Sequence, residues 1–188
     1  MAVLPINIYG DEILRQKAKK VTKVDDKLLN FIEDMFETMK KSDGIGLAAT
    51  QVGQRVQVLV ADISEIEGYE HTKPMVVINP KILVTDGESS MEEGCLSLPG
   101  LRVNVKRPDK IRLRYNDIDM KEYIEDFEGL AARVLQHEID HLNGRLIIDY
   151  LSKTEKEKIK PLLEKMIKRE IEVHYPITGY QVLEKSRS

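Results

Sequence analysis

Residues 129 to 144, GLAARVLQHEIDHLNG, constrain the fold of this chain more than any other segment. Their apolar residues recur at helical spacing around most of the circumference, which predicts a buried helix that Asn143 and Gly144 end. The same helix carries HEIDH, which places His137 and His141 one turn and about 40° apart. Burying two imidazoles and the carboxylate of Glu138 is costly unless a partner compensates them. We therefore expect a metal ion inside the fold.

The spacing within HEIDH indicates a different task for each polar side chain. Both imidazoles can reach one ion, whereas Glu138 lies on the flank of the pair and can reach a water on the metal without being a ligand. Asp140 falls on the opposite flank, where we expect it to support a neighbour or form a salt bridge. The alternative is a pair of core histidines that ordinary hydrogen bonds satisfy, and this pattern would then have arisen by chance among only four histidines.

A catalytic metal site usually needs a third protein ligand and one open position. The longer metzincin motif fails here, because Ile147 stands where its last histidine would be. A downstream glutamate is a second source, with Glu155, Glu157 and Glu164 as candidates, although these have the pattern of solvated helix charges. The third source is Cys95, the only cysteine, which is equally typical of a small buried apolar side chain. The residues themselves leave this choice open.

The order of the other elements predicts an α+β fold, in which antiparallel β-sheets pack around the buried HExxH helix between an N-terminal and a C-terminal helix. Strands cluster in the middle of the chain, at 56–62, at 75–85 as two segments broken at Pro80, and at 110–115 with a returning arm at 120–127. Helices are expected at 25–42 with an aspartate cap, and at 151–173 with a Ser152–Glu155 capping box and a kink or break at Pro161. We expect one domain, 1–188, with a loosely ordered tail, 174–188.

The stretch GIGLAATQVG, residues 44–53, begins with the G-x-G-x-x-A pattern of a dinucleotide-binding loop. Such a loop follows a strand and opens a helix, whereas this one follows a predicted helix and precedes a predicted strand. No acidic residue stands at a strand end about 20 residues further on. The sequence therefore argues against nucleotide binding.

Charge and hydropathy exclude other classes of protein. There are 29 basic and 32 acidic residues, and this balance argues against a dedicated nucleic-acid or membrane-surface protein. No stretch approaches the roughly 20 apolar residues that span a bilayer, and the first residues lack the features of a signal peptide. With a single cysteine, the expected location is the cytoplasm.

Three stretches together carry a family resemblance: GIGLAATQVG at 44–53, EGCLSLPG at 93–100 and QHEIDHLNG at 136–144. In this order they resemble the three signature motifs of the peptide deformylases, and the resemblance covers about 100 residues. The departures are small, with Thr50 where many members have proline and Leu98 where isoleucine or valine is common. The tail carries no motif of the family.

The resemblance implies a metal held by Cys95, His137 and His141, with water in the fourth position. The ion would be Fe²⁺, and Zn²⁺, Ni²⁺ or Co²⁺ could replace it. It further implies hydrolysis of the N-formyl group of N-formylmethionyl nascent polypeptides, with release of formate. Glu138 would act as general base and then as general acid, and the Gln51 side chain and the Leu96 backbone N–H would stabilise the oxyanion.

The family analogy also gives the glycine-rich stretch a purpose. The backbone at Ile45 and Gly46 would lie close to an extended substrate peptide, which adds alongside it like a strand. The methionine pocket would be apolar. Its expected walls are Ile45, Met91, Leu130 and Val134. Glu93 is expected either to orient the site or to meet the substrate.

Several expectations remain open at this stage. Arg133 lies beside the pocket-facing stripe, and would either extend to solvent or contact the peptide backbone. A transient ribosome contact through the basic stretch 165–169 competes with an ordinary solvated helix face. A metallopeptidase with a glutamate ligand and a protein whose ion only stabilises the fold are the rival functions. The native ion, the oligomeric state, the preference beyond the first methionine and the role of the tail are not fixed by the sequence.

Overall fold

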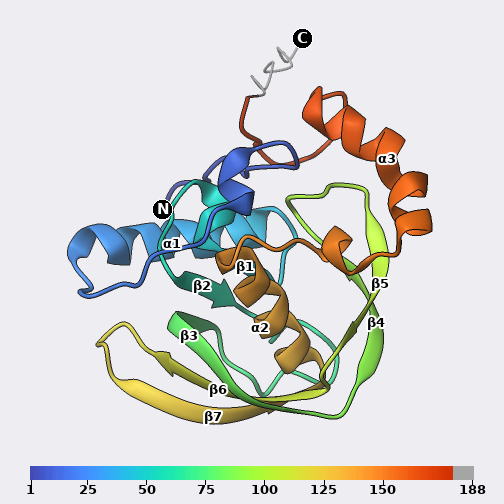
Figure 1. The fold of residues 1–188 in the computed structure, drawn as a ribbon. Helices are drawn as coiled ribbons and strands as arrows, with labels where there is room; N and C mark the ends of the chain where they lie inside the picture. The colour runs from blue at the N-terminus through green and yellow to red at the C-terminus, as the bar shows by residue number, and fades with distance from the viewer. Residues whose placement is uncertain (180–188) are drawn as a thin grey trace.

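The computed structural model describes residues 1–179, and it contains two antiparallel sheets. The larger sheet has five strands in the order β1-β2-β3-β6-β7, and the smaller one pairs β4 with β5. The strands are β1 Gly46–Ala48, β2 Val58–Ala61, β3 Met75–Asp86, β4 Ser89–Gly94, β5 Arg102–Arg107, β6 Lys110–Asn116 and β7 Glu122–Glu128. Helix α2, Gly129–Leu142, lies at the centre, with the five-stranded sheet curving beneath it and β4-β5 at its side (Figure 1). The predicted α+β class is confirmed.

Helix α1, Asp26–Lys41, forms where its apolar period predicts it. Asp25 is the N-cap, and its carboxylate accepts a hydrogen bond of 3.0 Å from the Leu28 N–H. The buried face of α1 carries Ile32, Met35 and Met39. The helix stops before Gly44, and the chain turns directly into β1, the edge strand of the larger sheet.

Strand β3 differs from the prediction of two segments broken at Pro80. It is continuous from Met75 to Asp86, with a register shift opposite β6 between Ile78 and Lys81. Asn79 adopts a left-handed backbone at this irregularity, with φ of 53°. Its side chain then exchanges two hydrogen bonds of 2.8 Å with the backbone of Val21. The proline therefore sits at a bulge, where no ladder hydrogen bond is required.

Helix α2 is as buried as its sequence indicates. Ala132, Leu135 and Leu142 are almost inaccessible, and they pack in a cluster with side chains of β2, β3 and β6. Asn143 caps its end and Gly144 follows with φ of +73°. A Cβ at Gly144 would lie 2.5 Å from the carbonyl oxygen of Arg15, so glycine is required there on two grounds. Burial on several faces fixes which side chains of α2 point toward β4 and β5.

The C-terminal part bears on two expectations. Helix α3, Lys153–Ile167, begins with the predicted Ser152–Glu155 capping box, and of the kink or break predicted at Pro161 the break does not occur. Most of its side chains are exposed, so water can satisfy the carbonyl that loses its partner at the proline. The chain from 174 to 179 was expected to be loosely ordered, yet Tyr175 and Ile177 are buried. The remainder of the predicted tail, 180–188, lies outside the described residues.

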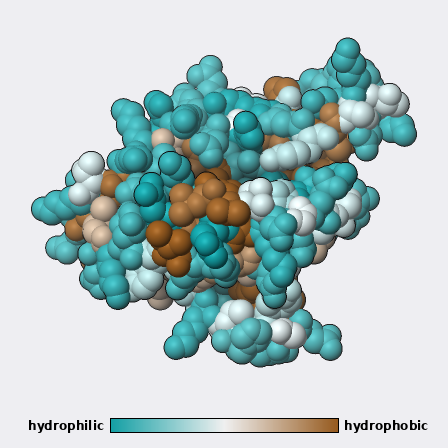
Figure 2. Space-filling view, turned by 60° about the horizontal axis from the view of Figure 1, so that its bottom comes forward, coloured by the Kyte–Doolittle hydropathy of each residue, from teal (hydrophilic) through white to brown (hydrophobic). Residues whose placement is uncertain are grey.

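On the face of the molecule in Figure 2, the largest gathering of hydrophobic residues lies near the middle, with smaller ones toward the edges, among hydrophilic residues. Among residues 1–179, no helix is both long and apolar enough to cross a bilayer. Short 3-10 turns complete the fold, at Glu12–Arg15, Ala49–Val52 and Ile147–Tyr150.

Candidate metal centre and active site

Three candidate ligands converge from two elements. Cys95 directly follows β4, while His137 and His141 project from successive turns of α2. Their potential ligand atoms all lie within 4.8 Å of one another, and Cys95 Sγ is 3.1 Å from His141 Nε2. Donors bound about 2.0–2.3 Å from one tetrahedral ion are separated by roughly 3.5 Å. The set therefore fits a single ion, and the glutamates of α3 are not part of this group.

A buried carboxylate fixes the ring of His137. Glu93 Oε2 lies 2.9 Å from His137 Nδ1, which leaves Nε2 on the side of Cys95. Arg107 binds both oxygens of Glu93, at 2.7 and 3.0 Å, and Arg133 reaches Oε1 at 2.9 Å. Burial alone would raise the pKa of Glu93, but the hydrogen bonds from His137 and Arg107 and the charge of Arg107 lower it to about 2. Glu93 is therefore a permanent anion that orients a ligand.

The electrostatics of the two histidines also fit a cation. Burial, the neighbouring His137 and the guanidinium of Arg107 lower the pKa of His141, so this ring keeps a free lone pair. Burial opposes a proton on His137 as well, but hydrogen bonds to Cys95 and Glu93 raise its pKa. A neutral His141 beside Cys95 offers a lone pair to a divalent ion, which would take the place of the proton on His137.

Glu138 stands beside the ligands as an unpaired acid. It is only 4% exposed, and its Oε2 has no hydrogen-bond partner. Burial raises its pKa to about 7, with Glu93 adding to the rise and His137 and Arg107 opposing it. A carboxylate with this pKa can both take and return a proton near neutral pH. This is the chemistry that the HExxH pattern predicts for it.

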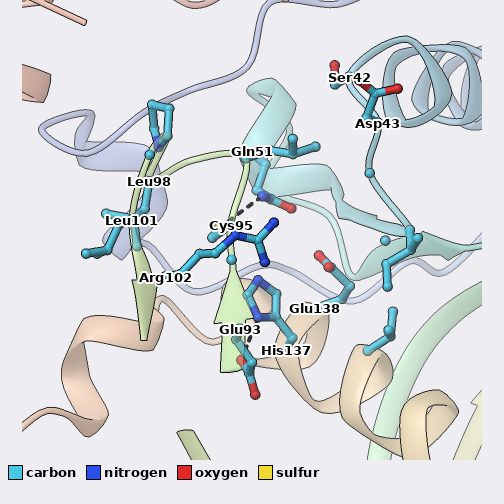
Figure 3. A pocket seen from close by; sticks show the side chains of 18 of the residues that line it. Ser42, Asp43, Gln51, Glu93, Cys95, Leu98, Leu101, Arg102, His137 and Glu138 are labelled. Carbon is cyan, nitrogen blue, oxygen red and sulfur yellow. Dashed lines mark hydrogen bonds and ion pairs between the residues drawn. The ribbon is translucent and has the colours of Figure 1, made fainter. Parts of the chain in front are cut away.

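The glycine-rich stretch brings Gln51 to the same place. Gln51 lies in the 3-10 turn Ala49–Val52, is 1% exposed, and its Oε1 accepts a hydrogen bond of 2.8 Å from the Ala48 N–H. This bond directs the amide Nε2 toward Cys95 Sγ, at 3.8 Å, and Ser97 Oγ, at 3.2 Å. Figure 3 shows Gln51 above Cys95, with His137 and Glu138 below. The amide is therefore aimed at the metal group.

The glycines of this stretch are needed for close approach. A Cβ at Gly46 would lie 2.6 Å from Glu138 Oε1 and 2.9 Å from Val134 Cγ1. A Cβ at Gly44 would lie 2.9 Å from Leu96 Cδ1. Strand β1 can thus run directly over the face of α2 that carries Val134 and Glu138 only because it has no side chain at 46.

These groups open into one cavity of about 580 Å³. The apolar residues predicted for the methionine pocket, Ile45, Met91, Leu130 and Val134, all line it, as do Gly46 and Leu96. Leu96 is further fixed by its carbonyl, which accepts a hydrogen bond of 2.8 Å from the Tyr175 hydroxyl. The predicted residues that were far apart in sequence are therefore brought together.

The contacts correct the expectation for Arg133 and bear on the two roles expected of Glu93. Arg133 neither extends to solvent nor is free for a peptide, because it is 4% exposed and bonded to Glu93, Ser89 and the Val105 carbonyl. Glu93 lines the cavity, but His137 and the two arginines occupy both of its oxygens. Of its two expected roles, these contacts favour orientation of the site over contact with substrate.

The sequence reasoning missed Arg107. It is 4% exposed and links Glu93 to Asp140, at 2.6 Å, and Tyr150 also bonds Asp140, at 2.7 Å. The salt-bridge role expected of Asp140 is confirmed. A signal was available: RVNVKR at 102–107 alternates, which places Arg107 on the inward face with Val103 and Val105.

A cysteine, two histidines from one helix and an unpaired buried glutamate, set in an apolar cavity, define the class of metal-dependent hydrolases. Comparison with known proteins narrows this class. The family model for polypeptide deformylase matches residues 3–157. The chain belongs to the peptide deformylase family, whose members are metal-dependent hydrolases.

Individual relatives agree over nearly the whole chain. The peptide deformylase of Chlorobium phaeobacteroides is 48% identical over 179 residues, which cover 95% of this chain and 97% of the relative. The Legionella pneumophila crystal structure is 38% identical with a TM-score of 0.82, and covers 90% of this chain and 98% of that one. An Ehrlichia chaffeensis peptide deformylase in complex with actinonin is 42% identical with a TM-score of 0.82, covering 92% and 100%.

Proposed function

We propose that this protein removes the N-formyl group from N-formylmethionyl nascent polypeptides and releases formate. The observation that carries the proposal is the group of Cys95, His137 and His141 beside the partnerless Oε2 of Glu138. Membership of the family supports the same reaction. We propose these three residues as the metal ligands. We propose Fe²⁺ as the native ion, as the family resemblance implies. Thiolate and imidazole suit several late first-row ions, so Zn²⁺, Ni²⁺ or Co²⁺ could replace it.

The bound ion would supply Lewis-acid activation of water and polarisation of the formyl carbonyl. Glu138 then takes the proton of the attacking water at Oε2 and returns it to the nitrogen of the leaving amine. Its pKa of about 7 matches both tasks. The amide of Gln51 donates to the developing oxyanion, with the Leu96 N–H as the second donor. The Gln51–Ala48 hydrogen bond holds that amide in place before substrate arrives.

Strand β1 offers the substrate a place to bind. It pairs only with β2 and therefore forms the edge of the five-stranded sheet. An extended peptide can add to this edge beside Ile45 and Gly46, and its methionine side chain can enter the apolar cavity lined by Met91, Leu130 and Val134. This arrangement would place the formyl group next to Glu138, since position 46 approaches its carboxylate.

The substrate also implies a setting. Formylated nascent chains are made at ribosomes, so we propose a cytoplasmic protein with transient ribosome contact. The basic stretch 165–169 supports such contact less than its sequence indicated. Arg169 is engaged with Asp11 and with the Thr178 carbonyl, which leaves Lys165 and Lys168 as its exposed cations.

The test is formate release from a formyl-Met-Ala-Ser peptide together with anaerobic metal analysis. We expect one ion per chain and formate release by the wild type. Glu138→Gln should keep the ion but lose formate release by about 10²-fold or more, because the proton acceptor is removed. Cys95→Ala should lose both. Full metal content in Cys95→Ala would favour the metallopeptidase alternative, and unchanged activity in Glu138→Gln would contradict the mechanism.

A further inference from the structure

A short C-terminal segment forms part of the cavity wall. Residues 172 to 175, which we call the C-terminal strap, line the cavity together with the catalytic residues. They lie beyond residue 157, where the match to the family model ends. The motifs account for the catalytic end of the cavity, but they assign nothing to this wall.

The strap is held firmly on its C-terminal side. Tyr175 is 8% exposed and donates its hydroxyl to the Leu96 carbonyl. The next residues pair with the N-terminal segment: the Ile6 N–H bonds the Pro176 carbonyl at 2.8 Å, and the Thr178 N–H bonds the Ile6 carbonyl at 3.0 Å. The strap is therefore a fixed wall rather than a chance contact of a loose end.

A contact between His174 and Asp43 closes the strap over the cavity. His174 Nε2 lies 3.1 Å from Asp43 Oδ2, and both side chains are largely exposed. The ring of Tyr175 packs edge-on against His174, with centroids 5.1 Å apart. Asp43 has φ of 55°, a conformation in which aspartate and asparagine are among the best-tolerated residues. Position 43 thus presents a carboxylate at a fixed point where His174 can reach it.

The position of this pair relates it to substrate length. Gly46 touches the catalytic carboxylate, Gly44 approaches Leu96, and Asp43 is exposed, so the stretch from 46 to 43 leads out of the cavity. Figure 3 shows Asp43 at the rim, away from Cys95 and His137. A peptide that adds beside Ile45 and Gly46 and extends beyond its first residue would pass the Asp43–His174 pair. The formyl group and the methionine lie deeper.

We propose that the C-terminal strap, closed by the His174–Asp43 pair, is a specificity-determining element that holds the substrate residues following the formylmethionine. The inference rests on the proposed function, since it assigns a role in binding the same substrate. The strap would favour a polypeptide over formylmethionine alone. Opening the pair removes one wall for the residues that follow, while Glu138 and the ligands stay in place.

The experiment compares formylmethionine amide with the amidated peptide formyl-Met-Ala-Ser-Ala, so that the two substrates differ in length and not in terminal charge. The measured quantity is the ratio of kcat/KM for the long substrate to that for the short one. We expect His174→Ala and Asp43→Asn to lower this ratio about two- to fivefold, mainly through KM of the long substrate, as fits a contact between two exposed side chains. Asn at 43 keeps the backbone conformation and removes only the charge.

Three further variants sharpen the result. The double variant should match either single one, because both remove the same contact. His174→Lys places a permanent cation opposite Asp43 and should retain most of the ratio. His71→Ala, an exposed histidine that does not line the cavity, is the matched control and should leave the ratio unchanged.

The outcomes separate this inference from the proposed function. If the wild type releases no formate from either substrate, the proposed function is wrong. If the wild type is active but the ratio in His174→Ala and Asp43→Asn equals that of the control, the strap inference is overturned. An equal loss on both substrates would also overturn it, because the strap would then support the catalytic end and not the residues that follow.

Discussion

At the scale of single residues, the site depends on how few atoms separate β1 from α2. Gly46 lies against Glu138 with no room for a Cβ, and Gln51 is aimed by one hydrogen bond to Ala48. Sequence patterns predicted the identity of these residues because the motifs are local. The clearance between them follows from the packing of two distant segments, which no local pattern contains.

Gly46→Ala should therefore damage catalysis without removing the metal. The new methyl group would meet Glu138 Oε1 at 2.6 Å, so the proposed general base has to move. We expect kcat to fall about 10- to 100-fold, since a misplaced base loses most of its contribution. Gly94→Ala is the control in the same cavity, because its Cβ would meet nothing closer than 3.7 Å. Equal activity losses in the two variants would show that the close approach is unimportant.

Arg107 binds the carboxylates of Glu93 and Asp140, and its loss should lower stability and metal affinity more than the loss of a surface arginine. Arg107→Met leaves the buried Glu93 and the partly buried Asp140 without this partner. We expect a loss of about 3–5 kcal/mol of unfolding free energy and about 10- to 100-fold weaker metal binding. Urea unfolding and metal competition measure the two effects.

The chain contains a matched control for this substitution. Arg112 binds both oxygens of Asp126 at 2.8 Å, but that pair is exposed on the sheet. Arg112→Met should change the urea midpoint little, because solvent screens such a pair. Similar losses for the two arginines would contradict the buried-network account.

At the scale of elements, the sequence predicted those features of helices and strands that interactions between neighbouring residues produce. The cap of α1, the capping box of α3 and the burial of α2 all follow from side chains within one or two turns. Strand β4 was missed because SSMEEG at 89–94 has almost no apolar residue to reveal its period, whereas β5 was missed although RVNVKR at 102–107 alternates. The packed strap was missed as well, since it depends on pairing between Ile6 and Ile177. Contacts across such separations leave no periodic mark in the sequence.

The continuity of β3 should depend on Asn79. Its side chain satisfies the backbone of Val21, and its backbone is left-handed. Asn79→Ala loses both hydrogen bonds and adds strain, which we expect to cost about 2–4 kcal/mol of unfolding free energy. Asn79→Gly loses the bonds but tolerates the backbone, and should cost about 1–2 kcal/mol. Chemical denaturation gives both values, and equal losses would show that the backbone conformation contributes nothing.

At the scale of the whole molecule, the proposed metal ligands come from separate parts of the fold. Cys95 follows the two-stranded sheet and the histidines lie on α2, which packs on the five-stranded sheet. A metal bound there connects both sheets through the central helix. Protein contacts already order much of this site, because the Glu93–Arg107 pair holds His137 in place and α2 is buried independently.

Metal removal should therefore weaken the fold without abolishing it. A ligand that binds the folded state alone stabilises it by about 4 kcal/mol at a thousandfold excess over its Kd. Anaerobic chelation should lower the thermal midpoint by several degrees and leave the far-ultraviolet circular dichroism nearly unchanged, because the buried core does not depend on the ion. Added Fe²⁺, Ni²⁺ or Co²⁺ should restore the midpoint. Cys95→Ala should show almost no metal-dependent shift, whereas Glu138→Gln should show the full shift, since it keeps every proposed ligand. Loss of secondary structure in the metal-free protein would contradict the proposal that Glu93 and Arg107 order the site before metal binds. A full metal-dependent shift in Cys95→Ala would contradict the assignment of Cys95 as the third ligand.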